Sequence, residues 1–546
     1  MRTVWTARRR ALRMVGAGLA TAALPARLGA AARAPAPGTS DFCTTPVAFD
    51  QRLNVPGGDG LQGYLAVGNA PLRLDAVART GTGPTLAFLA RANDRQYVDP
   101  TLVVARGATV RIGLNNAMTE PTIAHWHGLT NDTANDGNGE TLAPPGTTHE
   151  YAFAVRNRSG LYWYHPHPHG LTAGQAYRGL FGLMVVEDDD ELALRRSLDL
   201  VPGATDIPLV LHDRRSGTTD RYAPSPDDIR HGWYGDEVLV NFTPRPYLEV
   251  APRRYRFRVL NASNARIFRL GLRRDDGPAL PLLLIGTDGG LLEAPLPVKE
   301  LFVAPAERVD VLVDFAGVPA GRVALLESGA FDPMHLDTRP SAAKEAPSTP
   351  VVDEHGRRAD QAPASTTSGS DGAPFALLEF RIRGREPLSA PLLPARLSSL
   401  PAMPAPAPDQ DDRPLRLGFA KGRWRINDRV YDVDATPIVV VRQSVETWLL
   451  RNYHASMPHA MHLHGFQFRI VERETSPDWL APLTVDARGR LATDLGWKDT
   501  VLVWPGESVR IAIDFRHPFP GPQIYLVHCH NLEHEDGGMM LRIRVG

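Results

Sequence analysis

The feature that most constrains this chain is a stretch near its C-terminus, His528-Cys529-His530-Asn531-Leu532-Glu533-His534-Glu535-Asp536-Gly537-Gly538-Met539. In an extended strand, residues two apart share a face and the residue between them points the other way. His528 and His530 can therefore serve one metal site while Cys529 serves another. Cys529, His534 and Met539 supply most of a His₂Cys copper site with a weak axial Met, which is the electron-transfer type. That site lacks only a second imidazole.

Three further histidine clusters occur in the chain. They are His125-Trp126-His127-Gly128, His165-Pro166-His167-Pro168-His169-Gly170 and His459-Ala460-Met461-His462-Leu463-His464-Gly465. If His459 supplies the missing imidazole, eight histidines remain in four His-x-His pairs: His125, His127, His165, His167, His462, His464, His528 and His530. One such pair alone would be interpreted as hydrogen-bonded surface or core histidines. Four pairs, one of them straddling a cysteine, favour a cluster of three further metal ions.

Two short signatures occur three times each and set the number of domains. The first is a turn and an alternating strand that ends in Asn: RGATVRIGLNN from Arg106, PRRYRFRVLNAS from Pro252 and RQSVETWLLRNY from Arg442. The second is a Pro-containing turn and another alternating strand: PPGTTHEYAFAV from Pro144, APAERVDVLVDF from Ala304 and WPGESVRIAIDF from Trp504. The sequence therefore predicts a threefold repeat of a domain-sized unit.

The hydrophobic pattern predicts an all-β fold. Alternation such as Val309, Val311 and Val313 is typical of half-buried strands. With 48 Gly and 48 Pro between many short strands, each unit is expected to be an antiparallel β-sandwich or Greek-key barrel. Short helices are expected at residues 170–180 and 190–197.

Composition predicts the boundaries. The first domain covers residues 41–190 and ends at the acidic run from Glu187 to Glu191, which we interpret as a solvated linker. The second covers residues 200–384, with a flexible insertion near 337–374 that is rich in Pro, Ala, Ser, Thr and Gly. A linker over 385–413 leads to the third domain, residues 414–546. The His-x-His pairs fall only in the first and third domains, so the cluster should form between them, with the second domain as spacer and wall.

The N-terminus predicts export. Arg8-Arg9-Arg10-Ala11-Leu12-Arg13 precedes an apolar run from Met14 to about Ala26 and an A-x-A pattern at Ala32-Arg33-Ala34. This is typical of a twin-arginine signal peptide, assigned to residues 1–34. The alternative, a membrane anchor, requires a longer apolar run. A periplasmic or secreted protein without a membrane span in its mature form is expected.

Net charge and cysteine content indicate that the chain neither binds nucleic acid nor contains a disulfide. A formal net charge of −1 over 546 residues provides no basic footprint for nucleic acid. A disulfide between the two cysteines, Cys43 and Cys529, would destroy the copper site, so both are expected to be unpaired. A monomer is expected.

These motifs resemble those of the three-domain multicopper oxidases, the family that includes laccases, bilirubin oxidases and bacterial copper-efflux oxidases. The resemblance covers nearly the whole chain after the leader. The stretches TDGGLLEAPLPVKELFVAPAERVDVLVDF, GWKDTV and HPHPHGLTAGQAYRGLFGLMVVEDD are most similar to the bacterial copper-efflux and laccase branch. The resemblance implies three consecutive cupredoxin-like domains and four copper ions per chain: one type 1, one type 2 and two type 3.

The resemblance also implies a role for each ligand. His459, Cys529, His534 and axial Met539 match the type 1 ligands, and His125 and His462 match the type 2 ligands. His127, His165 and His530 match one type 3 copper, and His167, His464 and His528 match the other. The members of a pair can reach separate ions because residues two apart lie about 6–7 Å apart along a strand.

The implied activity is laccase-like. Phenolic or aromatic amine donors would each give one electron to the type 1 copper, and the trinuclear cluster would reduce O₂ to water with four electrons. Glu535 and Asp136 match acidic residues that relay protons or shape the O₂ channel in bacterial members. The alternatives are a plain surface carboxylate for Glu535 and an Asp-Gly turn for Asp136. His169 is expected to be a hydrogen-bond partner of the site rather than a ligand.

Other functions remain as alternatives. A periplasmic cuprous oxidase for copper tolerance would carry a Met-rich insertion over the type 1 site, and an Asp and a Met before the first ligand of this motif. Here Leu417 to Trp424 is a short join, Ala455 replaces the Asp and only Met457 remains, which favours phenols over Cu(I). A copper-dependent nitrite reductase or a non-catalytic blue-copper electron-transfer protein would leave the four His-x-His pairs unexplained. His454 and Met457 are expected to line the substrate mouth.

Overall fold

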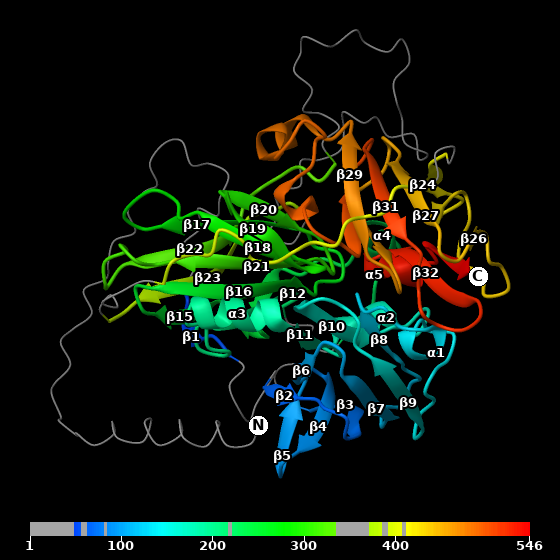
Figure 1. The fold of residues 1–546 in the computed structure, drawn as a ribbon, viewed down its shortest axis with the longest axis horizontal. Coiled ribbons are helices and arrows are strands. Elements are labelled where there is room, and N and C mark those ends of the chain that lie inside the picture. Colours follow the sequence, from blue (N-terminus) through cyan, green and yellow to red (C-terminus); the bar gives the residue numbers. More distant parts are fainter. Residues whose placement is uncertain are drawn as a thin grey trace, which may run out of the picture. The chain divides into compact units, whose positions relative to one another are not determined.

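The computed structural model describes residues 48–55, 63–80, 84–216, 221–334, 371–384, 391–406 and 411–546. Within these residues the chain forms three consecutive cupredoxin-like β-domains, each built from two sheets (Figure 1). The expected signal peptide, Cys43 and residues 337–370 of the expected insertion lie outside the described residues. None of the helices in the described part of the chain has the length and apolar character needed to span a bilayer.

The first domain packs two five-stranded sheets around one core. Its strands are β2 (Tyr64–Ala66), β3 (Leu72–Ala78), β4 (Leu86–Ala92), β5 (Arg95–Val98), β6 (Thr101–Ala105), β7 (Thr109–Asn116), β8 (Ala124–His127), β9 (Thr148–Ala154), β10 (Gly160–Pro166) and β11 (Gly182–Glu187). The sheet orders are β5-β4-β3-β7-β9 and β2-β6-β11-β10-β8. Three short helices accompany these strands: α1 (Thr133–Asp136), α2 (Thr172–Tyr177) and α3 (Asp189–Ser197). The short helices expected near 170–180 and 190–197 are thus confirmed.

The second domain pairs a seven-stranded with a six-stranded sheet. Its elements are β1 (Gln51–Arg52), β12 (Asp206–Arg214), α4 (Pro226–His231), β13 (Glu237–Val240), β14 (Thr243–Pro244), β15 (Pro246–Val250), β16 (Arg254–Asn261), β17 (Phe268–Arg274), β18 (Leu282–Thr287), β19 (Gly290–Val298), β20 (Glu300–Val303), β21 (Arg308–Asp314), β22 (Val323–Ser328) and β23 (Phe375–Ile382). The sheet orders are β14-β13-β12-β16-β21-β18-β19 and β1-β15-β23-β22-β17-β20. Because β1 pairs with β15, this short strand belongs to the second domain's sheet, although the sequence placed it in the first domain.

The third domain again packs two five-stranded sheets. Its elements are β24 (Arg413–Ala420), β25 (Arg423–Ile426), β26 (Ile438–Val440), β27 (Val445–Asn452), β28 (His459–Leu463), β29 (Phe468–Glu474), the 3₁₀ helices η4 (Asp478–Leu483) and η5 (Ala492–Asp494), β30 (Thr500–Val503), β31 (Ser508–Asp514), β32 (Gln523–Cys529), α5 (Leu532–Asp536) and β33 (Met540–Val545). The sheet orders are β25-β24-β27-β31-β29 and β26-β33-β32-β28-β30.

The two repeated signatures form the same structure in every domain. The first signature becomes β7, β16 and β27, and each pairs antiparallel with the strand of the second signature, β9, β21 and β31. Each first strand ends in an Asn: Asn116, Asn261 or Asn452. Its side-chain amide donates to one backbone carbonyl in the loop that follows and to a second carbonyl 27 to 51 residues farther along the chain. The predicted threefold repeat is confirmed, and the repeated Asn is explained by this loop clamp.

The acidic run at the end of the first domain is not simply a solvated linker. Asp188 caps the N-terminus of α3, and Glu191 is fully buried. The Glu191 carboxylate lies 2.8 Å from the Arg256 guanidinium and also pairs with Arg258. This correction arises because β16 brings two arginines under α3, and their charges need buried acidic partners.

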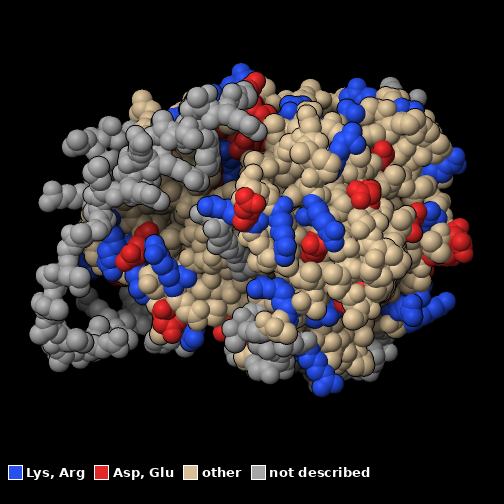
Figure 2. Space-filling view, turned by 90° about the horizontal axis from the view of Figure 1, so that it is seen from below, with Lys and Arg blue, Asp and Glu red and all other residues tan. Residues whose placement is uncertain are grey.

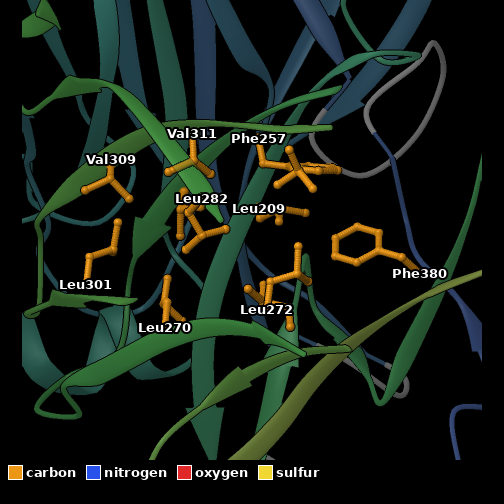
Figure 3. Close-up of a pocket in the computed structure, with 12 residues that line it drawn as sticks. Leu209, Phe257, Leu270, Leu272, Leu282, Leu301, Val309, Val311 and Phe380 are labelled. Atoms are coloured by element: carbon orange, nitrogen blue, oxygen red, sulfur yellow. The ribbon is translucent and has the colours of Figure 1, made fainter. Parts of the chain in front are cut away.

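The core of the second domain encloses a cavity of about 10 Å³ with apolar walls, including Leu209, Phe257 and Val311 (Figure 3). Such walls offer a water molecule no hydrogen-bond partner. This cavity therefore has no groups for metal or redox chemistry.

The surface carries both signs of charge. Figure 2 views one face of the molecule and shows Lys and Arg interspersed with Asp and Glu over its described residues. This mixture agrees with the formal net charge of −1.

Replacing Glu191 with Gln should destabilise the protein by about 3–5 kcal/mol, because it leaves buried arginine charge without its partner. The matched control is Glu249→Gln, which breaks the exposed pair with Arg383 and should cost about 0–1 kcal/mol. Urea unfolding followed by circular dichroism measures both free energies of unfolding. Equal losses in the two variants would contradict the assigned role of Glu191.

The stabilising contribution of Glu191 should also depend on pH. The neighbouring arginines outweigh burial and hold the pKa of Glu191 well below its usual range, so this contribution should disappear as pH falls below about 4.

Candidate metal centre

Two strand pairs in different domains carry the histidines. In the first domain β8 pairs with β10, which places His125 opposite His165. In the third domain β28 pairs with β32, which places His462 opposite His528. These pairs are local consequences of antiparallel register, in which opposite residues lie on the same face.

Rings from the two domains meet directly. The ring centroids of His127 and His462 are 3.7 Å apart, and those of His125 and His464 are 3.8 Å apart, with both pairs stacked. All eight histidines of the four His-x-His pairs are at most 1% exposed. The structure therefore confirms that the first and third domains meet at this cluster.

Several ring nitrogens at the cluster lack protein partners. Nε2 of His125, Nε2 of His462 and both nitrogens of His167 are buried without a hydrogen bond to any described residue. An unsatisfied buried polar atom costs about 1–3 kcal/mol. Several of them beside one another indicate a site that a metal ion completes, since neutral imidazole nitrogen is a common metal ligand.

Hydrogen bonds to backbone carbonyls at the edge of the imidazole cluster, which we call its rim, determine which nitrogen of a ring faces the other rings. Nδ1 of His125 lies 2.7 Å from the carbonyl oxygen of Asp136, and Nδ1 of His462 lies 2.8 Å from that of Asp499. A carbonyl oxygen can only accept, so each Nδ1 carries the hydrogen and each Nε2 keeps its lone pair. The rim thus prepares both rings to bind a metal through Nε2.

His127 is oriented the opposite way. Its Nε2 lies 3.1 Å from a carboxylate oxygen of Asp499, whereas its Nδ1 lies 3.3 Å from Nε2 of His165. His530 joins this group, with its Nε2 3.4 Å from Nε2 of His165. On the other side of the cluster, the ligand atoms of His167, His464 and His528 lie within 4.8 Å of one another.

A buried ion-pair network between the second and third domains holds the Asp499 carboxylate that orients His127. Arg308 on β21 donates to Asp499 over 2.7 Å, and Lys498 lies 2.9 Å from both Asp288 and Glu307. Asp499 also forms a potential metal-binding group with two of the histidines, but its pairing with Arg308 makes it a positioning residue. These roles were not predicted from the sequence; the available signal was charged residues at or next to the ends of apolar strands, at positions 288, 307–308 and 498–499. Both faces of β21 are buried, although the alternation of Val309, Val311 and Val313 predicted a half-buried strand.

Both predicted acidic residues lie beside the imidazoles. Glu535 is 2% exposed, with a carboxylate oxygen 3.2 Å from Nδ1 of His528. Asp136 is 1% exposed, with a carboxylate oxygen 2.8 Å from Nδ1 of His464. Neither residue is a surface carboxylate, and Asp136 does end α1 at a turn, as the alternative interpretation proposed.

A separate group surrounds Cys529. Its sulfur lies 3.4 Å from Nδ1 of His459 and 3.6 Å from Nδ1 of His534. Met539 is fully buried in the same core cluster as Cys529, and its N–H donates to the carbonyl of His534 over 2.8 Å. The predicted cysteine, histidines and methionine therefore come together below the protein surface.

The donor atoms of this group fit copper. Burial lowers the pKa of His459 to about 3 and raises the pKa of Cys529 to about 12. Without a cation the group consists of neutral imidazoles and a neutral thiol, and a bound metal would stabilise the thiolate. One sulfur and two imidazoles, beside a methionine, match the ligand preference of a blue-copper site.

The remaining predicted residues lie around the two groups. His169 bonds through Nε2 to the carbonyl of Asn138 at 2.9 Å and belongs to none of the potential metal-binding groups found in the described chain. Met461 is a core residue, and Met457 is 5% exposed, so it is packed rather than open to a substrate. His454 is exposed in the loop that follows β27.

Comparisons with known proteins give a consistent family. Two multicopper oxidase family models match residues 89–191 and 405–546. The chain is 30% identical to a bilirubin oxidase from Albifimbria verrucaria, over 81% of this chain and 70% of that protein. It is also 30% identical to a laccase from Bacillus subtilis, over 77% and 78%. The crystal structure of the McoA multicopper oxidase from Aquifex aeolicus matches 91% of this chain and 99% of its own, with 33% identity and a TM-score of 0.76.

Acidification should destabilise the metal-free protein through the buried imidazoles. Burial lowers the pKa of His165 to about 4, whereas the unfolded residue takes up a proton below about pH 6.5. Stability from this residue is therefore present above pH 6.5 and is lost as pH falls, by about 2 kcal/mol between pH 7 and pH 5. Urea unfolding at both pH values should show a smaller loss in His165→Gln than in wild type. The exposed His454→Gln should match wild type; equal losses in all three proteins would refute this contribution.

Proposed function

The chain belongs to the multicopper oxidase family of oxygen-dependent oxidoreductases, and on that premise we propose that it is a laccase-type enzyme. It oxidises phenolic or aromatic amine donors by one electron at a type 1 copper and reduces O₂ to water with four electrons at a trinuclear cluster. The observation that carries this proposal is that two of the eight buried imidazoles, those of His528 and His530, flank Cys529 of the buried thiol–imidazole group at the end of β32.

We assign the ligands as follows. His459, Cys529, His534 and axial Met539 hold type 1 copper; His125 and His462 hold type 2 copper; His127, His165 and His530, and His167, His464 and His528, hold the two type 3 coppers. The close approach of ligand atoms within these sets supports the assignment. When bound, copper supplies one-electron redox chemistry and open positions for O₂.

The protein connects the two groups through its backbone. Cys529 is bonded covalently to His528 and His530, and its side chain lies on the opposite face of the strand from theirs. A copper held by Cys529 would therefore be linked to coppers held by His528 and His530 through the main chain between adjacent residues.

Proton supply is the second task of the chain. Reduction of O₂ to water consumes protons, and the Glu535 carboxylate lies 3.2 Å from Nδ1 of His528 and 3.5 Å from Nε2 of His167. We assign it the role of delivering protons to the cluster. Asp136 bonds to His464 and orients His125 through its carbonyl, which suits a residue that positions ligands and holds a proton at the rim.

The surroundings of Cys529 favour organic donors. Leu417 to Trp424 form a hairpin in which Ala420 faces Arg423, so only Lys421 and Gly422 turn between the strands. No methionine is added there to bind Cu(I). We further propose that the enzyme acts in the periplasm or outside the cell, on the basis of the N-terminal sequence.

The direct test is copper content followed by O₂ uptake with a phenol and with Cu(I). We expect about four coppers per chain and phenol-dependent O₂ consumption without release of peroxide. A strong preference for Cu(I) would replace the laccase assignment with a cuprous oxidase. A protein that binds about one copper and consumes no O₂ would support a blue-copper electron-transfer protein instead.

Cys529→Ser should remove the blue colour and abolish phenol oxidation, because the soft thiolate ligand and the connection to the cluster are both lost. Total copper should fall by about one ion per chain, because the imidazole cluster remains intact. Absorption spectra, metal analysis and O₂ uptake measure these effects. Cys43→Ser is the matched control and should retain all three properties; phenol oxidation by Cys529→Ser would contradict the proposed route.

A further inference from the structure

Four consecutive side chains near the end of α5 point to four different partners. His534 faces Cys529, Glu535 lies beside His528, and Asp536 accepts hydrogen bonds from the backbone N–H groups that begin α2. The proposed function uses His534 and Glu535. Glu533 points toward the second domain instead, and nothing above assigns it a role.

The Glu533 carboxylate is 2% exposed and accepts three hydrogen bonds. The donors are the hydroxyl of Tyr222 at 2.9 Å, the backbone N–H of Trp233 at 3.0 Å and the side-chain amide of Asn264 at 2.8 Å. All three come from the second domain. Tyr222 and Trp233 lie on either side of α4, so one carboxylate holds both ends of the segment that contains this helix.

The segment from Tyr222 to Trp233, which we call the α4 cap, contacts the proposed type 1 ligand His534. The carbonyl oxygen of Arg230 accepts from Nε2 of His534 over 3.0 Å and from the indole N–H of Trp424 over 2.7 Å. The Trp424 ring in turn lies 4.7 Å from the His459 ring and 5.0 Å from the His534 ring, centroid to centroid.

The Arg230 carbonyl fixes the state of His534. Because a carbonyl only accepts, Nε2 of His534 carries the hydrogen and Nδ1 keeps its lone pair toward the Cys529 sulfur. The same contact covers the outer edge of the ring, which is 1% exposed. This one carbonyl therefore orients the His534 ring toward the sulfur and also covers its outer edge.

The α4 cap depends on its ends for its position. Helix α4 has only six residues and none of them is buried, so its length alone does not hold it in place. Within the helix, Asp228 pairs with Arg215 of the second domain. At its C-terminal end the backbone is packed tightly: a Cβ added to Gly232 would lie 2.4 Å from Cβ of Ala265 and 2.9 Å from the side-chain nitrogen of Asn531. The ion pair of Arg215 with Asp228 and the stacking of Arg215 on Trp233 hold the cap to the second domain, whereas Glu533 joins both of its ends to the third domain through hydrogen bonds to a carboxylate.

We propose that Glu533 is a positioning residue for His534: by anchoring both ends of the α4 cap, it holds the Arg230 carbonyl against the imidazole and keeps the cap closed over the metal site. An electron-donating substrate that approaches this metal site would then contact the α4 cap rather than the outer edge of the His534 ring. The consequence for donors rests on the proposed function, whereas the anchoring itself does not.

The test begins with hydrogen exchange in the metal-free protein. Glu533→Gln should speed exchange in peptides covering residues 222–233 by about tenfold or more, as expected for loss of hydrogen bonds to a charged acceptor. Tyr222→Phe should have a smaller effect. In the double variant the two effects should not add, because both changes act on one contact. Exchange that stays at the wild-type rate in Glu533→Gln, or effects that add fully, would overturn the anchor.

Ser476 and Glu507 provide a matched control pair. The Ser476 hydroxyl lies 2.6 Å from the buried Glu507 carboxylate, in the third domain and outside the potential metal-binding groups. Ser476→Ala and Glu507→Gln likewise delete a hydroxyl and a buried carboxylate charge, and Glu507→Gln also breaks an ion pair with Arg473. Because these changes lie elsewhere, neither should change exchange at residues 222–233. Equal acceleration by Glu507→Gln would assign the effect to general loss of stability and overturn the anchor.

A Co(II) titration of the metal-free protein tests the effect on His534 without relying on oxidase activity. Wild type and Glu507→Gln should give the same thiolate-to-Co(II) absorption band, and Glu533→Gln should give a shifted or broadened band because the imidazole is no longer held. An unchanged band together with faster exchange would overturn the positioning role. If both tests give the expected changes in Glu533→Gln but the wild-type protein consumes no O₂, the proposed function is rejected and this inference stands.

Discussion

The structure depends on holding neutral imidazoles with their lone pairs directed into one shared space. Burial keeps these rings neutral, but a buried nitrogen without a partner is unfavourable. An acceptor on the outer side of a ring therefore determines which of its nitrogens faces inward. The carbonyls of Asp136 and Asp499 do this for His125 and His462. The remaining unsatisfied nitrogens are left for metal ions, whose binding would then also stabilise the fold.

This constraint explains why three domains are needed. The first and third domains supply the imidazoles from one strand pair each, and neither has enough for the cluster. The second domain has no ligand in the assigned sets, yet it supplies Arg308 to hold Asp499, and the Arg230 carbonyl to hold His534. The expected spacer and wall is therefore also what orients the ligands of both groups.

Much of this arrangement could be predicted from the sequence, because it is local. Short segments of sequence are enough to recognise the His-x-His spacing and the Asn at the end of β7, β16 and β27. The same holds for the hydrophobic alternation in these strands and in β9, β21 and β31. The contacts of Asp499 with Arg308 and of Glu533 with Tyr222 join residues 191 and 311 positions apart, and no spacing rule connects such distant residues. Glu191 was misinterpreted for the same reason: its acidic neighbours suggested solvent, whereas the arginines that bury it lie on β16.

The most direct test of the account is a crystal structure of the copper-loaded protein with anomalous difference maps measured at the copper edge. The account predicts three peaks among the eight imidazoles and one peak between Cys529, His459 and His534. The account would be contradicted by peaks at other positions, or by a metal-loaded protein whose imidazole cluster contains no copper.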